Sequence, residues 1–372
     1  MKIAIDATVL PEKMGGAGIY VLNLIKVLSK IDRKNKYFIF IEKRNIKKFK
    51  LGDNFHLIGI KSMPRSLRLL WEQIVFPFLL RRYKIEVLHS PRYTIPLLRF
   101  AWKSVVTFHD LLFLLFPKKH NVLKRFFYGR MLPIAAKKAE RIIAVSSATK
   151  KDIAKLLNIP SEKIEVINLG IDSSYHPIEK KELQDFRRKE EIFGSFILYV
   201  GTLKKRKNVL NIIKAYKKIK EKKIKEKLVI VGNKSGEYQN IYKAVKNLGL
   251  KKDVFFTGYV DEKLLPFYYN SASLFIYPSL YEGFGLPVLE AMASGTPVIT
   301  SNVSSLPEVA GDAALLVNPH DVEEMAEMMQ KVLNDQELQE KMREKGLKRA
   351  KLFSWERCAR ETLNLYKEIG GE

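Results

Sequence analysis

Short apolar runs alternate with segments of helical spacing along the whole sequence, and this alternation restricts the fold more than any other feature. The expected strands are 2–7, 37–41, 55–60, 86–89, 104–108, 141–145 and 164–167, followed by 196–200, 228–231, 254–257, 273–277, 297–300 and 313–317. The expected helices include 18–28, 67–82, 122–138, 322–333, 336–351 and 355–369. Alternation of this kind predicts mainly parallel sheets covered by helices on both faces, the doubly wound α/β class.

The alternation stops once and then restarts, which predicts two Rossmann-like domains in series. The break is a polar stretch at 171–182 that contains the letters D-S-S-Y-H-P-I-E-K. A polar, proline-containing break between two periodic halves is typical of a hinge. The domains are therefore expected at 1–175 and 176–354, and 372 residues are enough for two domains of ordinary size.

Positive charge is concentrated in the first half of the chain. Residues 1–175 hold 33 Lys and Arg against 13 Asp and Glu, whereas residues 176–372 hold 33 against 27. The basic half predicts an anionic partner: nucleic acid, an anionic membrane or a phosphorylated acceptor. The alternative is a lysine-rich composition of the heat-tolerant kind.

The remaining composition points to a cytoplasmic protein. A single cysteine, Cys358, excludes an internal disulfide and a multi-cysteine metal site, as expected in a reducing compartment. The first residues read as a strand that contains Asp6 and not as a signal peptide. The apolar runs 74–80 and 111–116 are far shorter than the roughly 20 residues that cross a bilayer.

One stretch, 278–311, carries the clearest chemistry. Glu282 and Glu290 are separated by seven intervening residues, which include the turn Phe284-Gly285-Leu286-Pro287, and they follow directly after an expected strand. Proline is favoured at the first helical position, and a helix start suits an anion such as phosphate. Two carboxylates beside such a helix start can accept hydrogen bonds from the hydroxyls of a sugar and of a ribose. The stretch therefore predicts a site for a sugar joined to a nucleotide.

The letters E-G-F-G-L-P-V-L-E, followed by A-M-A-S-G-T-P-V-I, resemble the E-x7-E signature of retaining GT-B glycosyltransferases of family 4. The tail S-S-L-P-E-V-A-G-D-A-A-L-L-V is similar to a mannosyltransferase-like subgroup of that family. The resemblance implies a GT-B fold, in which two Rossmann-like domains face a cleft. It also implies that 1–175 is the acceptor domain, with the last helix (355–372) packing back on it, and that 176–354 is the donor domain.

The resemblance assigns the donor contacts residue by residue. Glu282 would contact the sugar hydroxyls, Glu290 the ribose, and the backbone of Phe284, Gly285 and Leu286 the sugar and phosphate. Arg206 and Lys207 match the family's R-K pair at the diphosphate, although Thr202 stands where some relatives carry an arginine. Fixed cations there would stabilise the negative charge that develops on the leaving diphosphate. Gly258 and Tyr259 end a later strand and are candidates near the base.

The first half carries three further candidates. The loop 14–18 reads M-G-G-A-G and precedes a helix, so Gly15 and Gly16 are candidates for the phosphate side. With Glu42 as the ribose acid it also suggests a dinucleotide site, but the third glycine of that fingerprint is absent and the loop resembles the GGxG loop of the family instead. His109 matches the histidine that borders the transferred sugar, and His89 is a candidate on the acceptor side.

The family resemblance implies a retaining hexosyltransferase that works without a metal ion, and the subgroup resemblance favours transfer of mannose from GDP-mannose to a glycan or lipid-linked acceptor. UDP-glucose is the alternative donor. Two other classes stay open at this point: a nucleic-acid-binding protein, which would explain the charge, and a nicotinamide-dependent oxidoreductase, which would explain the glycine loop. The basic, apolar segments 65–84 and 118–141 predict contact with an anionic membrane at its inner face, or else ordinary amphipathic helices packed on a core.

Overall fold

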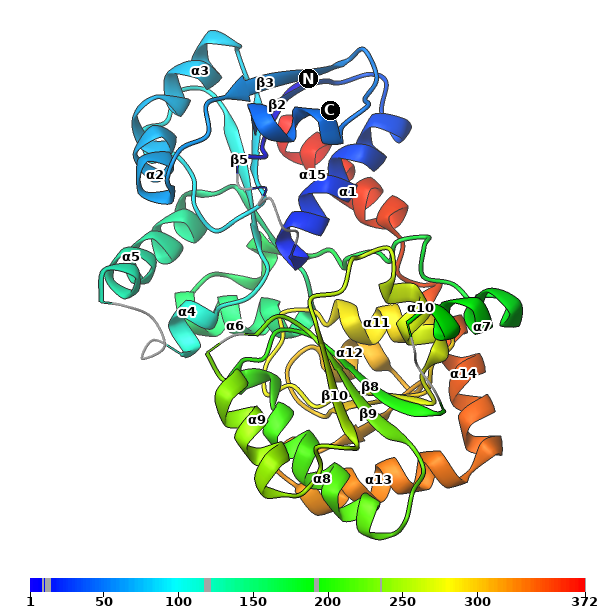
Figure 1. Cartoon of the computed structure of the whole chain (residues 1–372). Helices are drawn as coiled ribbons and strands as arrows, with labels where there is room; N and C mark the ends of the chain where they lie inside the picture. Colours follow the sequence, from blue (N-terminus) through cyan, green and yellow to red (C-terminus); the bar gives the residue numbers. More distant parts are fainter. Residues whose placement is uncertain (9, 11–14, 117–121, 191–193, 235, 372) are drawn as a thin grey trace. The chain divides into compact units, whose positions relative to one another are not determined.

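The computed structural model describes residues 1–371 except 9, 11–14, 117–121, 191–193 and 235 (Figure 1). The chain divides into two compact units: a first unit of residues 1–170 and 354–372, and a second unit of residues 171–353. The sequence predicted this division five residues later, at 175. Residues 171–175 belong to the second unit, where the Ile171 amide donates to the Phe353 carbonyl (3.2 Å) and the Tyr175 ring lies against Tyr269.

The first unit is built on a parallel sheet that has seven strands among the described residues, in the order β3-β2-β1-β4-β5-β6-β7. The strands are β1 (Lys2–Asp6), β2 (Lys36–Glu42), β3 (Phe55–Ile60), β4 (Val87–Ser90), β5 (Lys103–Phe108), β6 (Arg141–Ala144) and β7 (Ile164–Val166). The helices are α1 (Gly16–Ile31), α2 (Arg65–Ile74), α3 (Phe76–Arg82), α4 (Leu112–Leu115), α5 (Val122–Lys138), α6 (Ser147–Leu157) and α15 (Trp355–Gly370). Helices α1 and α15 cover one face, and α2, α3 and α5 cover the other (Figure 1).

The second unit repeats the plan with a parallel sheet of six described strands, in the order β10-β9-β8-β11-β12-β13. The strands are β8 (Phe196–Val200), β9 (Lys227–Val231), β10 (Val254–Gly258), β11 (Leu274–Tyr277), β12 (Val298–Ser301) and β13 (Leu315–Val317). The helices are α7 (Lys180–Lys189), α8 (Val209–Glu221), α9 (Tyr238–Asn247), α10 (Leu265–Ser271), α11 (Leu286–Ala293), α12 (Leu306–Ala310), α13 (Val322–Asn334) and α14 (Gln336–Ala350).

The helix predicted at 67–82 is two helices, because the chain breaks at Val75 between α2 and α3. Pro77 is the second residue of α3, and a proline has no N–H to continue the helical ladder from α2. The two short helices pack over a core cluster that includes Phe40, Phe76 and Trp102. None of the described helices is both long and apolar enough to span a bilayer.

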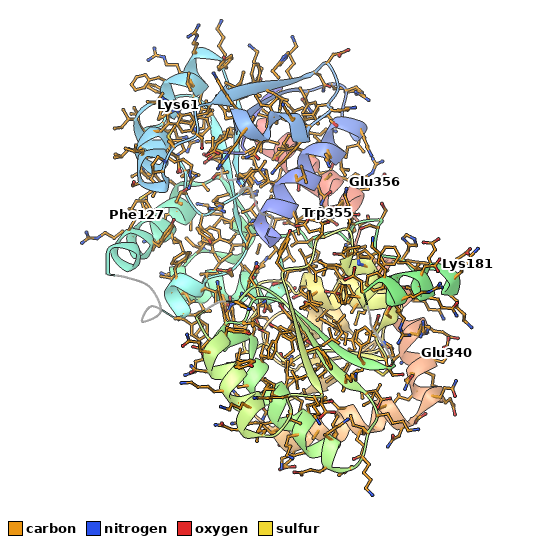
Figure 2. All side chains as sticks on the ribbon, in the orientation of Figure 1. Lys61, Phe127, Lys181, Glu340, Trp355 and Glu356 are labelled. Carbon is orange, nitrogen blue, oxygen red and sulfur yellow. The ribbon has the colours of Figure 1, made fainter. Side chains whose placement is uncertain are left out.

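The last helix, α15, completes the first unit although the whole second unit separates it in sequence from the rest of that unit. It packs along α1 and reaches β4 and β5. Its first residue, Trp355 (Figure 2), lies so near Gly170 that an added Cβ on this glycine would stand 2.1 Å from the Trp355 nitrogen. Only glycine allows this close approach of the two backbones.

Candidate active site

The strand order of the second unit places two loops side by side at a topological switch point. Neighbouring strands β8 and β11 are parallel, and the order reverses between them, so the loops 201–208 and 278–285 leave the same edge of the sheet. In open α/β sheets ligands bind at this position, outside the carboxyl ends of the strands. The backbone there is tight: an added Cβ on Gly232 would stand 1.9 Å from the Gly201 carbonyl oxygen.

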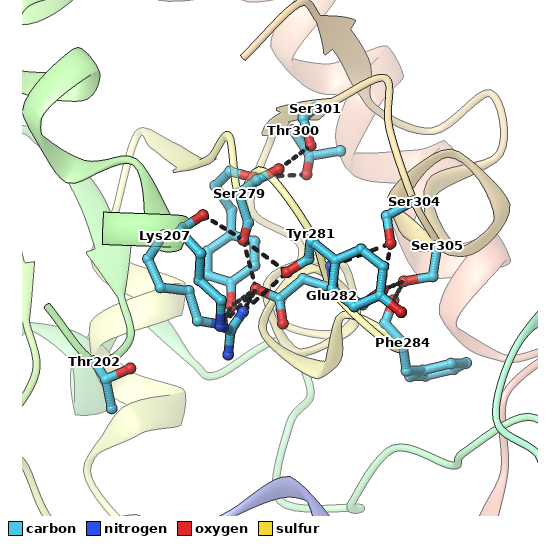
Figure 3. A network of polar contacts seen from close by, with 12 residues as sticks. Thr202, Lys207, Ser279, Tyr281, Glu282, Phe284, Thr300, Ser301, Ser304 and Ser305 are labelled. Carbon is cyan, nitrogen blue, oxygen red and sulfur yellow. Dashed lines mark hydrogen bonds and ion pairs between the residues drawn. The ribbon is translucent and has the colours of Figure 1, made fainter. Parts of the chain in front are cut away.

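Four donors from these two loops and from β11 converge on a single oxygen of Glu282. Glu282 Oε1 accepts from Arg206 Nη1 (2.8 Å), Lys207 Nζ (2.5 Å), Ser279 Oγ (2.6 Å) and the Tyr277 hydroxyl (3.1 Å), as Figure 3 shows. Glu282 Oε2 accepts from no residue within the described part of the chain. The motif glutamate and the cationic pair predicted at the diphosphate therefore form one cluster, with one carboxylate oxygen left over for a ligand.

Backbone contacts fix the Glu282 loop from the opposite side. The Glu282 amide donates to Ser304 Oγ (3.2 Å), and the Ser304 and Ser305 hydroxyls both donate to the Glu282 carbonyl (Figure 3). Arg206 Nη1 also donates to the Tyr281 carbonyl (2.9 Å). The carboxylate is thus held by its own loop and by the loop that carries the cations. Such rigid positioning is what a binding site for a charged ligand requires.

The charges in the cluster support one another. Burial would raise the pKa of Glu282, but Lys207 and Arg206 outweigh this effect and hold the pKa below its ordinary value, so the carboxylate is ionised. Burial lowers the pKa of Lys207 to about 8 against the opposing effect of Glu282, with Arg206 adding repulsion. The cluster carries two cations and one anion at neutral pH, and a second anion would balance it.

The start of α11 offers unbonded backbone donors next to this cluster. The amides of Phe284, Gly285 and Leu286 donate to no acceptor in the described part of the chain, and they precede or begin an α-helix. Gly285 has a left-handed conformation (φ 116°), and an added Cβ would stand 2.7 Å from a Leu306 methyl carbon. Pro287 is the second helical residue, one position later than predicted. This helix start matches the phosphate-ready turn expected from the sequence.

Glu290 lies further along α11, on its buried side. Its carboxylate accepts from the Tyr269 hydroxyl (2.8 Å), and 9% of the residue is exposed. Burial raises the pKa of Glu290 to about 7; the Tyr269 hydrogen bond opposes this rise, and Glu262 and Asp172 add to it. Unlike Glu282, this carboxylate has no cation within ion-pair distance among the described residues. A bound hydroxyl group would supply part of the missing stabilisation.

The candidates near the base lie apart from the Glu282 cluster. Gly258 ends β10 in a left-handed conformation (φ 73°), and the Tyr259 side chain is exposed. Gly258 makes no hydrogen bond to Glu282 or Lys207 in the described part of the chain. Thr202, which stands where some relatives carry an arginine, contributes no cation. Its carbonyl accepts from the Tyr199 hydroxyl (3.2 Å), which helps to hold the loop.

In the first unit His109 and His89 have different surroundings. His109, half-buried at the end of β5, donates from Nε2 to the Pro91 carbonyl (3.0 Å), and burial lowers its pKa to about 4. It is therefore neutral at pH 7, with Nδ1 able to accept a hydrogen bond. His89 is fully buried between Tyr366 of α15 and Thr107 and bonded to both, which favours a structural role for this histidine over contact with an acceptor.

The glycine loop of the first unit is described only in part. Gly15 is the N-cap of α1 with extended backbone, Gly16 is the first helical residue, and both are exposed. Residue 14 and the residues before it back to 11 lie outside the described residues. Glu42, the acid of the dinucleotide hypothesis, is buried and accepts from Arg44 Nε (2.6 Å).

Comparison with known proteins decides the family. The descriptions "Glycosyltransferase Family 4" and "Glycosyl transferases group 1" match residues 14–175 and 182–349. The O-antigen chain mannosyltransferase B of Escherichia coli is 34% identical over 290 residues, which are 77% of this chain and 76% of that protein. The chain belongs to glycosyltransferase family 4. The family predicted from the E-x7-E motif is confirmed. Membership of this family argues against the two other classes that the sequence left open, a nucleic-acid-binding protein and a nicotinamide-dependent oxidoreductase.

Solved structures agree on the fold of this glycosyltransferase. Sucrose-phosphate synthase from Thermosynechococcus elongatus has a TM-score of 0.80 at 22% identity and covers 99% of this chain and 98% of its own. Anabaena HepE in complex with UDP-glucose has a TM-score of 0.75 at 17% identity and covers 98% of this chain and 100% of its own. The GT-B fold class with two Rossmann-like units is therefore confirmed.

Sequence reasoning missed the serines of the glycosyltransferase site. Ser279 bonds the Glu282 carboxylate, and Ser304 and Ser305 bond its carbonyl. Ser279 was detectable as the polar residue that follows a buried strand at the switch point. Ser304 and Ser305 lie in the S-S-L-P tail, which carried the subgroup resemblance but no assigned role.

The pKa of Glu290 gives a prediction for the pH dependence of stability. Its folded-state pKa is raised above 4.5, so its stabilising contribution is complete below about pH 4.5 and is lost as the pH rises through about 7. In Glu290→Gln this loss is absent. We expect the variant to gain about 2 kcal/mol over the wild type between pH 5 and pH 8. Thermal unfolding at both pH values measures the gain, and Glu344→Gln, at an exposed position of α14, is the control.

Proposed function

We propose that this glycosyltransferase moves a mannosyl residue from GDP-mannose to a hydroxyl group of a glycan or lipid-linked acceptor, with retention of anomeric configuration. The observation that carries the proposal is the cluster in which Arg206, Lys207 and Glu282 meet at the switch point of the second unit. Its two neighbouring cations suit a diphosphate. Its unused Glu282 oxygen suits sugar hydroxyls.

The second unit offers a protein group that could contact each part of a nucleotide sugar. Arg206 and Lys207 would contact the diphosphate, aided by the free amides from Phe284 to Leu286. Glu282 Oε2 would accept from sugar hydroxyls while Oε1 stays bonded to the cations. Glu290 would accept from the ribose, and the loop at Gly258 and Tyr259 would border the base, as the family resemblance implies.

The reaction breaks the bond between the anomeric carbon and the diphosphate oxygen, and that oxygen keeps the electron pair. The acceptor oxygen forms the new bond to the anomeric carbon, and its proton passes to the departing phosphate on the same face. Arg206 and Lys207 stabilise the charge that grows on the leaving group. His109, neutral at pH 7, is proposed to orient the sugar through a hydrogen bond and not to act as a general acid.

We also propose that stabilisation of the negative charge on the leaving diphosphate needs no divalent metal ion. Two fixed cations, Arg206 and Lys207, would neutralise the diphosphate in place of a metal. Transfer should therefore continue at an unchanged rate after dialysis against EDTA. A loss of activity that Mg²⁺ or Mn²⁺ restores would contradict this point.

The donor sugar is proposed from relatives. The Escherichia coli relative is named a mannosyltransferase, which supports mannose, whereas HepE was solved with UDP-glucose. A thermal-shift screen of GDP-mannose, UDP-glucose, GDP, UDP and the bare nucleosides separates base from sugar. We expect GDP-mannose to raise the unfolding temperature most and to be consumed in a transfer assay with mannose-ended oligosaccharides. Stabilisation by UDP-glucose alone would replace mannose by glucose, and the absence of any nucleotide response would overturn the donor site.

A membrane partner for the first unit is proposed from its surface. Leu67, Leu70 and Ile74 follow one face of α2, and Phe78 of α3 and Phe100 extend it; we call these five residues the apolar stripe. They are 36–59% exposed. Cations surround the stripe: Lys61 (Figure 2), Arg81, Arg82 and Lys84 are all exposed. An apolar face edged by cations suits an anionic lipid surface. The second segment, 118–141, is described only in part, and its Leu132 and Ala136 face the core.

The stripe gives a flotation experiment. Wild-type protein should float with liposomes that contain phosphatidylserine, less so at 0.5 M salt, because each surface cation contributes about 1 kcal/mol at low salt. The variant Leu70→Ser with Ile74→Ser and Phe78→Ser should float several times less. Tyr242→Ser with Phe255→Ser removes exposed apolar groups from the second unit and serves as the control. Equal flotation of all three proteins would contradict the assignment.

A further inference from the structure

A second cationic pocket lies on the other side of the loop that carries Arg206 and Lys207. It is a cavity of about 260 Å³ at the beginning of α8, lined by Lys204, Lys205, Lys214, His320 and the apolar side chains of Ile241 and Leu280. No residue of the Glu282 cluster and neither motif glutamate lines it. Helices α8, α9 and α13 stand on this face of the sheet, whereas α10, α11 and α12 stand on the face that holds the motif glutamates (Figure 1).

The pocket lysines differ from their neighbours in having no carboxylate partner. Further along the same helix, Lys217 pairs with Glu221, Lys218 with Glu323 and Lys220 with Asp253, at 2.5–3.3 Å. Lys204, Lys205 and Lys214 make no ion pair or side-chain hydrogen bond with any described residue. One acid, Glu237, is present in the described lining, so three cations face one anion across the cavity.

The helix start in this pocket also lacks its usual cap. Asn208 stands at the N-cap in a left-handed conformation (φ 62°), and its side chain donates to the carbonyls of Pro278 and Pro319 instead of accepting from the helix. The amides of Val209 and Leu210 donate to no described acceptor. A helix of 13 residues thus presents free N–H groups and its positive dipole end to a cavity that three unpaired lysines already make electropositive.

We propose that this pocket binds a phosphate-bearing anion, either inorganic phosphate or a phosphate monoester, at a site separate from that of the donor. Lysines supply point charges and the helix start supplies directed N–H donors, which is the usual combination for a phosphate group. The cavity has room for a phosphate together with a small polar group.

An occupant of this pocket would act on the donor site through the shared loop. The Lys207 amide donates to the Lys204 carbonyl (2.8 Å), and the Lys204 amide donates to the Thr202 carbonyl (2.8 Å), so two of the pocket lysines, Lys204 and Lys205, share one hydrogen-bonded turn with Arg206 and Lys207. A phosphate bound to Lys204 holds that turn in place. The site is therefore suited to regulation of donor binding by a phosphorylated metabolite.

The test is calorimetric titration of the wild-type enzyme with inorganic phosphate and with glucose 6-phosphate, each in the presence of saturating GDP. GDP occupies the donor site, so heat that remains belongs to the second pocket. In Lys204→Ala with Lys214→Ala we expect affinity for the better ligand to fall about tenfold or more, while GDP affinity changes by less than about threefold. The control, Lys180→Ala with Lys181→Ala, removes the same charge from exposed positions of α7 (Figure 2).

Three results would overturn the proposal. The first is absence of phosphate and glucose 6-phosphate binding to the GDP-saturated wild type, which would show that both reach only the donor site. The second is equal loss of affinity in the two double variants, which would reduce the effect to net charge. The third is unchanged affinity in Lys204→Ala with Lys214→Ala. Because GDP binding is measured separately, failure here is distinguishable from failure of the proposed donor site.

Discussion

Glu282→Ala should abolish transfer and lower the unfolding temperature by roughly 10 °C, while the protein still binds GDP. The stability loss follows from the cluster: alanine leaves the buried Lys207 and the mostly buried Arg206 without their counter-ion. Removal of one partner of a buried ion pair costs about 3–5 kcal/mol, and each kcal/mol is worth about 2–4 °C in a domain of this size. Diphosphate binding survives because both cations remain, and the variant no longer places the Glu282 anion beside the ligand.

Differential scanning calorimetry and a transfer assay measure the two effects separately. Glu282→Gln keeps the shape and can still accept from Ser279 and Tyr277, so it should recover part of the stability but not the turnover, which we expect to stay about 10³-fold below wild type. Glu327→Ala, at an exposed position of α13, is the control for loss of a carboxylate. Wild-type turnover in the glutamine variant would contradict the proposal that an ionised Glu282 contacts the sugar and is needed for transfer.

Arg206→Ala with Lys207→Ala should weaken GDP binding about 10²-fold or more and leave guanosine binding within about threefold. Two charge-assisted hydrogen bonds to the diphosphate are lost, and neither reaches the nucleoside. Because this variant leaves Glu282 buried and unpaired, adding Glu282→Gln should restore stability without restoring GDP affinity. Lys180→Ala with Lys181→Ala controls for net charge, and equal losses for GDP and guanosine would contradict the diphosphate assignment.

Lys207 should also make the affinity of the wild-type enzyme for GDP depend on pH. The pKa of Lys207 is about 8 in the free protein, so this side chain loses its charge as the pH rises past that value. GDP affinity should fall from pH 7.5 to pH 9 in isothermal titrations, and guanosine affinity should not. A flat GDP profile would assign the diphosphate contact to Arg206 alone.

The sequence was informative wherever one local rule decides the structure. Buried parallel strands appear as short apolar runs, so the expected strand at 196–200 coincides with β8. The glycine and proline of the 284–287 turn predicted a helix start at Pro287, one residue after the observed start at Leu286, because the backbone conformation there needs them. Arg206, Lys207 and Glu282 could be assigned to one site because their loops follow parallel strands.

Contacts between distant segments could not be predicted in this way. Nothing near His89 indicates that Tyr366, 277 residues later, encloses it, so burial removed a candidate that strand-end position favoured. Likewise, the helix expected at 67–82 has continuous apolar spacing, and the break at Val75 depends on Pro77 and on packing over the sheet. Ser304 and Ser305 became relevant only when α12 was brought beside the Glu282 loop.

The return of α15 to the first unit has a consequence for biosynthesis. The segment 354–372 is translated after the whole second unit, yet α15 supplies Tyr366 to His89 and packs along α1. The second unit is contiguous and can condense on the nascent chain, whereas the N-terminal sheet lacks α15 on the face it shares with α1 until that segment has been synthesised. In this enzyme the half that is translated first is the half that matures last.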